Sequence, residues 1–135
     1  MPTKAKKILL VEDNPGDVLL MEEAFKEHAG DEFKLVHETC LQNALKRLTE
    51  EKMDAILLDL FLPDIFGLET IVQAYQAHPQ IPIIALTSFY DERTISHAIR
   101  MGAQDYLSKD DLKGETLVES LRRCTTHERV SSENN

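Results

Sequence analysis

The sequence has little cysteine, no excess of basic residues and no long apolar run. Fifteen Lys and Arg stand against 24 Asp and Glu, which gives a formal net charge of −9. Nucleic-acid binding needs clustered Lys and Arg to neutralise phosphates, so direct contact with nucleic acid is disfavoured. No apolar run approaches the roughly 18 residues that suggest a membrane helix. We therefore expect neither a nucleic-acid-binding surface nor a membrane segment.

The few cysteines and histidines argue against a transition-metal site. Cys40 and Cys124 lie far apart and match no metal-ligand spacing. We expect both to be small buried side chains in a reducing cytoplasm. The five histidines also lack ligand spacing, and none is expected at the carboxyl end of a strand. The stretch Met1–Lys7 has three lysines without an apolar stretch, so we expect no signal peptide.

The order of the apolar patterns predicts one α/β domain. With 135 residues, 42% hydrophobic and 29% charged, the chain has globular values. The predicted strands are 7–11, 33–37, 54–58, 81–86 and 104–107, and the predicted helices are 15–29, 40–51, 66–77, 91–101 and 113–126. Strands that alternate with helices of this length predict a doubly wound, five-stranded parallel sheet. We divide the chain into an arm (1–5), the domain (6–126) and a polar tail (127–135).

Several helix boundaries have a local signal. Asn14-Pro15 offers an N-cap followed by proline at the first helical position. Gly30 and Gly102 stand where left-handed C-terminal caps are expected. The segment 39–42, Thr-Cys-Leu-Gln, has the spacing of a capping box.

Two apolar runs end in acidic residues. Ile8–Val11 is followed by Glu12 and Asp13, and Ala55–Leu58 is followed by Asp59. Because chemistry in parallel sheets occurs at the carboxyl ends of strands, we expect the three carboxylates to gather at one edge. Carboxylates this close repel one another, which raises a pKa unless a cation joins them. Oxygen ligands suit a hard cation such as Mg²⁺.

The fourth and fifth predicted strands add hydroxyl groups and a cation to this edge. Thr87 and Ser88 follow the fourth strand, and Lys109 follows the fifth. Such a set suits a phosphate and a divalent metal. Asp59 would be the nucleophile that attacks phosphorus, and Asp13 would hold Mg²⁺ with it. Lys109 would pair with a phosphoryl oxygen.

Taken singly, each of these residues has a commoner explanation. An Asp after a strand is usually a turn or cap residue. Glu12-Asp13 is often ordinary surface charge, Thr87 could cap the next helix, and Lys109 could be a solvated loop residue. It is their placement at successive strand ends of one predicted sheet that favours a site.

In combination these motifs resemble the receiver domain of bacterial two-component response regulators. The resemblance rests on Glu12-Asp13, Asp59 in ILLDLFLPDIFG, Thr87-Ser88 and Lys109 in DYLSK, and it extends from about residue 6 to 123. It implies a flavodoxin-like fold that accepts a phosphoryl group onto Asp59 from a sensor histidine kinase or a histidine phosphotransfer protein.

The resemblance also implies roles for further residues. Asp13 and Asp59 would bind Mg²⁺ (or Mn²⁺), with Glu12 acting through water and the Phe61 backbone carbonyl as a further ligand. Thr87 and Tyr106 would form the switch that changes a protein-binding surface, although Tyr106 could equally be a core aromatic.

The resemblance also implies that Phe61, Ser88 and Phe89 influence the access of water to the phosphoryl group. Two large rings suggest slow hydrolysis through exclusion of water. The alternative is that the rings only cover the edge of the site. Many receivers follow the lysine with a cis proline, whereas here Asp110 follows. Because a cis bond before a residue other than proline is costly, a trans bond becomes possible, and the sequence leaves cis and trans open.

The leading interpretation is a cytoplasmic, single-domain phosphoacceptor signalling protein rather than an enzyme. We expect a monomer that acts on a downstream protein, with phosphorylation-dependent dimerisation through the fourth and fifth helices as an alternative. A haloacid-dehalogenase-type phosphatase would need a second acid where Phe61 stands. An interaction module that kept only the fold would lack site residues. The receiver portion of a larger kinase or nucleotide cyclase stays open.

Overall fold

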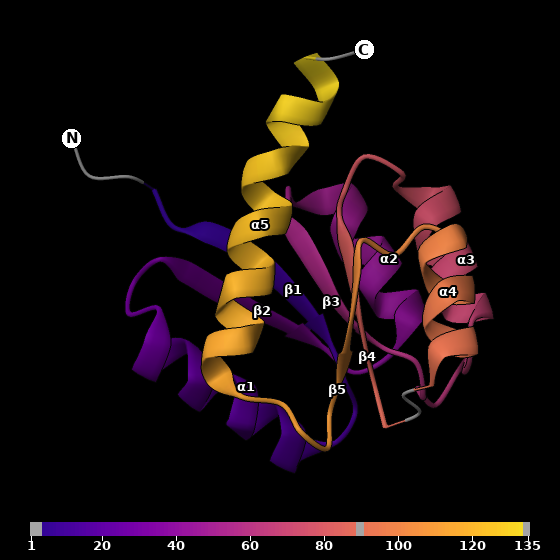
Figure 1. Cartoon of the computed structure of the whole chain (residues 1–135), viewed down its shortest axis with the longest axis horizontal. Coiled ribbons are helices and arrows are strands. Elements are labelled where there is room, and N and C mark those ends of the chain that lie inside the picture. Colours follow the sequence, from indigo (N-terminus) through magenta and orange to yellow (C-terminus); the bar gives the residue numbers. More distant parts are fainter. Residues whose placement is uncertain (1–3, 89–90, 134–135) are drawn as a thin grey trace.

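Five parallel strands and five helices alternate along the chain in a computed structural model (Figure 1), which describes residues 4–88 and 91–133. The strands are β1 (Lys6–Val11), β2 (Phe33–Glu38), β3 (Ala55–Asp59), β4 (Ile83–Thr87) and β5 (Asp105–Ser108). The helices are α1 (Pro15–His28), α2 (Leu41–Glu50), α3 (Glu69–Ala77), α4 (Glu92–Arg100) and α5 (Gly114–Glu133). The predicted fold class and order of elements are confirmed.

The strand order is β2-β1-β3-β4-β5, with every neighbouring pair parallel. The order reverses between β1 and β3, because β2 lies on one side of β1 and all later strands lie on the other. Ligands of open α/β sheets bind outside the carboxyl ends of strands at such a reversal. The fold therefore favours a ligand site at the carboxyl ends of β1 and β3.

The side chains of each central strand point alternately into two hydrophobic layers, one on each face of the sheet. Leu9, Leu58 and Ala85 pack under α2, α3 and α4, whereas Ile8, Leu57 and Leu86 pack under α1 and α5. Figure 1 shows α1 and α5 on the near face of the sheet, with the other helices behind and beside it. Because both faces are covered, β1, β3 and β4 are apolar on consecutive residues, as predicted.

The Asn14-Pro15 and glycine signals are confirmed. The Asn14 side chain accepts hydrogen bonds from the Gly16 and Asp17 backbone N–H groups at 2.8 and 3.2 Å. Gly30 and Gly102 have φ angles of +56° and +128°. At Gly102 a Cβ atom would also lie 2.6 Å from the ring of Tyr75, so this position closes α4 against α3.

The capping-box prediction at 39–42 is wrong. No side chain of that segment caps α2. Instead Asp64, in the loop after β3, accepts hydrogen bonds from Leu41 N–H at 3.1 Å and Gln42 N–H at 2.9 Å. A carboxylate at a helix N-terminus satisfies free N–H groups and complements the helix dipole. The cap comes from another part of the chain, so local spacing did not reveal it.

Two predicted helix ends also differ from the structure. Helix α3 begins at Glu69 rather than 66, because Phe61 and Phe66 form a β-bridge and Gly67 N–H donates to the Leu60 carbonyl. Helix α5 ends at Glu133 rather than 126. The segment 127–133 contains neither Gly nor Pro, and polarity alone does not stop a helix. The division into arm, domain and tail stays a prediction.

Replacing Asp64 by Ala should destabilise the protein by about 1 kcal/mol, the usual effect of losing an N-cap. The free energy of unfolding in urea measures this effect. Asp31→Ala, which removes another exposed acid, is the matched control. An Asp64→Ala variant as stable as the control would show that the cap contributes nothing.

Candidate functional site

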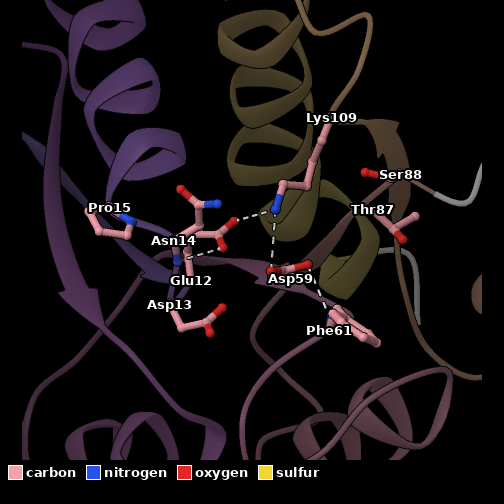
Figure 2. Close-up of a pocket in the computed structure, with 9 residues that line it drawn as sticks. All are labelled: Glu12, Asp13, Asn14, Pro15, Asp59, Phe61, Thr87, Ser88 and Lys109. Atoms are coloured by element: carbon pink, nitrogen blue, oxygen red, sulfur yellow. Dashed lines mark hydrogen bonds and ion pairs between the residues drawn. The ribbon is translucent and has the colours of Figure 1, made fainter.

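The acidic residues lie where the strand order reverses. Glu12 and Asp13 follow β1 directly, and Asp59 is the last residue of the neighbouring strand β3. Figure 2 shows the Glu12 and Asp59 side chains on either side of the Lys109 ammonium group, with Asp13 beside them. The predicted gathering of the three carboxylates at one edge is confirmed.

Glu12 and Asp59 are buried and held by backbone groups, whereas Asp13 is exposed. Glu12 Oε2 accepts a hydrogen bond from Asn14 N–H at 3.1 Å. Asp59 Oδ1 accepts one from Phe61 N–H at 3.2 Å. Since each carboxylate has one oxygen fixed by the backbone of a loop, its other oxygen has a defined direction into the site.

Burial raises the pKa of Asp59 to about 7, and the neighbouring Glu12 carboxylate contributes to the rise. The Lys109 ammonium acts in the opposite direction but does not offset these effects. Without a further cation, Asp59 therefore binds a proton at pH values where an exposed aspartate is ionised. The pKa of Asp59 is thus raised mainly by burial, and the expected effect of the crowded carboxylates is a smaller contribution.

Lys109 is the cation of the site. Its backbone N–H donates to the Thr87 carbonyl at 2.9 Å, which fixes the start of the loop after β5. Its Nζ lies 2.8 Å from Glu12 Oε1, 2.7 Å from Asp17 Oδ2 and 3.3 Å from Asp59 Oδ2. Burial lowers the pKa of Lys109, but the bonds to Asp17 and Glu12 and the charge of Asp59 raise it above its usual value. Lys109 is thus not a solvated loop residue.

Glu12, Asp13 and Asp59 have the donor set of a hard divalent cation. One oxygen from each carboxylate lies within 4.8 Å of the others. Within the described residues this is the one group of three or more acids, histidines or cysteines close enough to hold an ion. An all-oxygen set with one exposed member leaves room for the waters that Mg²⁺ retains, so these residues fit that ion.

Most of the predicted site residues line one cavity of about 550 Å³. Its walls are Glu12, Asp13, Asn14, Pro15, Asp59, Phe61, Thr87, Ser88 and Lys109 (Figure 2). Thr87 is 3% exposed and does not cap α4, whose N-cap is Asp91. Ser88 is exposed, and its hydroxyl lies 3.4 Å from Asp110 Oδ1. Phe89 lies outside the described residues.

Tyr106 does not line this cavity. Its side chain is 3% exposed and belongs to the core layer under α2, α3 and α4. Tyr106 does line a neighbouring cavity of about 380 Å³, which also touches Thr87 and Phe61. The two cavities therefore share Thr87 and Phe61 as common wall residues.

Phe61 forms an aromatic pair on the rim of the site. Its ring and that of Phe66 are 6.0 Å apart at an interplanar angle of 68°, an edge-to-face arrangement. The two residues are 64% and 69% exposed. The described peptide bonds include no cis bond, so Lys109–Asp110, which the sequence left open, is trans.

Sequence reasoning missed Asp17 and His37. Asp17 was not singled out, although it stands in the first turn of α1, close to the end of β1. His37 was placed away from strand ends, which is wrong: it is the last residue but one of β2, and its Nε2 lies 2.7 Å from the Glu12 carbonyl oxygen. The predicted strand 33–37 itself ended at this histidine, and that signal could have identified it.

Comparisons with known proteins agree with this geometry. The response regulator receiver domain family matches residues 8–122. The chain is 33% identical over 118 residues to the transcriptional regulatory protein YdfI of Bacillus subtilis (strain 168), covering 85% of this chain and 53% of that protein. It is 33% identical over 104 residues to the alkaline phosphatase synthesis transcriptional regulatory protein PhoP of the same organism, covering 77% and 42%. The chain thus spans about half the length of these curated relatives.

Solved structures share the fold. A CheY-like response regulator receiver domain protein from Methanospirillum hungatei JF-1 has a TM-score of 0.81 at 19% identity, over 94% of this chain and 98% of that one. The signal receiver domain of an HD domain-containing protein from Pseudomonas fluorescens Pf-5 has a TM-score of 0.84 at 24% identity, over 100% and 97%. With the matched family and the site at the β1–β3 reversal, the chain belongs to the response regulator receiver domains of two-component signalling.

Proposed function

We propose that this chain accepts a phosphoryl group on Asp59 from a phosphohistidine of a sensor kinase or a phosphotransfer protein. The observation that carries the proposal is the position of Asp59 among three other groups. One oxygen each of Glu12 and Asp13 lies within 4.8 Å of an Asp59 oxygen. Lys109 Nζ lies 3.3 Å from Asp59 Oδ2, and Thr87 lines the same cavity. An ionised carboxylate between a cation and a metal site is a suitable nucleophile for phosphorus.

In the transfer, an Asp59 oxygen would form a bond to phosphorus while the phosphorus–nitrogen bond of the donor breaks. The product is an acyl phosphate, and the donor histidine keeps the electron pair of the broken bond. Lys109 would pair with one phosphoryl oxygen, and the Thr87 hydroxyl would donate to another. Both groups reach the site from strand ends that the sheet fixes, which reduces the cost of orienting them.

Glu12, Asp13, Asp59 and the Phe61 backbone carbonyl would hold Mg²⁺ or Mn²⁺, with Glu12 acting through water. When bound, the ion offsets negative charge on the transferring group. The raised pKa of Asp59 supports this assignment, because a cation would keep the nucleophile ionised at neutral pH.

The output would be a protein contact that changes with phosphorylation. Thr87 lines both cavities, and Tyr106 lines the second, so movement of Thr87 toward a phosphoryl group would alter the space beside Tyr106. We propose that this alters the face formed by α4, β5 and α5, which then binds a downstream protein.

We further propose that the chain acts in the cytoplasm as a monomer. No helix among the described residues has the length and apolar character of a membrane span.

Asp59→Asn should abolish phosphorylation by acetyl phosphate with Mg²⁺, because an amide is a poor nucleophile. Intact-mass spectrometry should show one added phosphoryl group on the original chain and on Asp31→Asn, the control for loss of a remote acid. If neither protein gains mass, or if Asp59→Asn gains as much as they do, the proposed function is wrong.

Mg²⁺ should raise the Tm of the protein, because it binds the folded carboxylates and relieves their repulsion. At tenfold excess over Kd the stabilisation is about 1.4 kcal/mol. In Asp13→Asn the shift should shrink, while the Tm without metal should not fall, since one repelling charge is gone. Asp31→Asn should keep the full shift. An equal shift in Asp13→Asn would exclude Asp13 as a ligand.

Phe61→Asn should shorten the lifetime of the acyl phosphate, because a polar side chain admits water where the ring now lies. We expect roughly a threefold shorter lifetime or more, which is about 0.65 kcal/mol in the barrier. Loss of the phosphorylated mass after removal of the donor measures it. Phe66→Asn, which changes the other ring of the pair, is the control, and equal lifetimes in all three proteins would refute water exclusion by Phe61.

A further inference from the structure

Asp17 makes the shortest contact of the Lys109 ammonium group. The Nζ–Oδ2 distance is 2.7 Å, against 2.8 Å to Glu12 and 3.3 Å to Asp59. Lys109 is 15% exposed in its side chain and Asp17 is 27% exposed, so the pair is largely shielded from water. The ammonium donates hydrogen bonds to Glu12 Oε1 and Asp59 Oδ2 and forms an ion pair with Asp17 Oδ2, so three carboxylates surround its three protons.

The position of Asp17 is fixed by the cap of α1. Asn14 Oδ1 accepts from Gly16 N–H and from Asp17 N–H, and Pro15 begins the helix. The Asn14 N–H group in turn donates to Glu12 Oε2. One short turn therefore orients both Glu12 and Asp17, the two closest acceptors of the Lys109 protons.

Phosphorylation would affect the three carboxylates that contact Lys109 differently. Asp59 would lose an acceptor oxygen to the acyl phosphate, and its contact with Lys109 is already the longest. Glu12 would also serve the metal site. Asp17 has neither function. It is not one of the three carboxylates of the candidate metal site, and it does not line the cavity of about 550 Å³.

We propose that Asp17 is a positioning residue, which holds Lys109 so that one ammonium proton is directed at the incoming phosphoryl oxygen. This inference rests on the proposed function of Asp59. Asp17 and Glu12 hold the ammonium group in place, and its hydrogen bond to Asp59 is exchanged for one to a phosphoryl oxygen, while all three protons stay on Nζ. Without Asp17, the ammonium would have two acids and solvent as acceptors, and its direction would no longer be fixed.

A purely structural role makes different predictions. An acid in the first turn of a helix also stabilises that helix through its dipole. Loss of that effect would lower stability, but it would not depend on a hydrogen-bond acceptor facing Lys109. Asp17→Asn separates the two roles, because the amide removes the charge but keeps one acceptor oxygen, which rotation of the amide can direct at Lys109.

The test compares Asp17→Ala, Asp17→Asn and the control Glu22→Ala, which removes an exposed acid from the same helix. The rate constant of phosphorylation by acetyl phosphate at saturating Mg²⁺ should fall roughly tenfold or more in Asp17→Ala, the usual cost of losing a group that orients a functional side chain. Asp17→Asn should recover most of the rate, and Glu22→Ala should match the original chain.

A second readout reports on Lys109 directly. Its ammonium signal in ¹⁵N–¹H NMR spectra, assigned by its loss in Lys109→Arg, should be visible in the original chain and broadened by exchange with water in Asp17→Ala. If the original chain is phosphorylated and Asp17→Ala is unchanged or faster, the positioning role is wrong. A rate that falls equally in all three variants also overturns it. No phosphorylation of the original chain would overturn the proposed function, and the positioning role with it.

Discussion

One ammonium group is the shared partner of three carboxylates at the carboxyl edge of the sheet. Lys109 Nζ lies between Glu12, Asp17 and Asp59, and two of these acids are almost completely buried. Charges removed from water need partners, and one cation does not balance three acids. Burial and the neighbouring Glu12 carboxylate raise the pKa of Asp59 more than Lys109 lowers it. The site therefore favours the arrival of a further cation.

The hydrophobic layers make this concentration of charge possible. Residues 8–11 of β1 and all residues of β3 and β4 are buried, and the apolar side chains alternate between two packed layers. A slip of one residue in any of these strands would exchange the two layers and move the polar residue at the end of the strand. The core thus fixes the backbone on which Glu12 and Asp59 stand, so that mutual repulsion cannot push them apart.

The sequence was sufficient to identify a site residue where that residue followed a strong apolar run. Glu12, Asp13, Asp59, Thr87 and Lys109 were found because strand ends converge in a parallel sheet, whatever the details of the loops. Asp17 and Asp64 were missed because each acts on a group from a different element. Their roles depend on distances across the fold, and no spacing along the chain records those. The same reason explains the wrong capping box at 39–42, where a local pattern was present but a remote carboxylate held the helix.

The cap that Asp64 provides has a consequence for folding. Helix α2 precedes Asp64 in the chain, so during synthesis its first turn emerges before its cap does. Two of its backbone N–H groups gain their partners only when the loop after β3 has closed. Ordering of the α2 N-terminus and closure of that loop are therefore coupled into one cooperative unit. A fragment that stops before this loop would have the residues of α2 without the contact that defines where the helix begins.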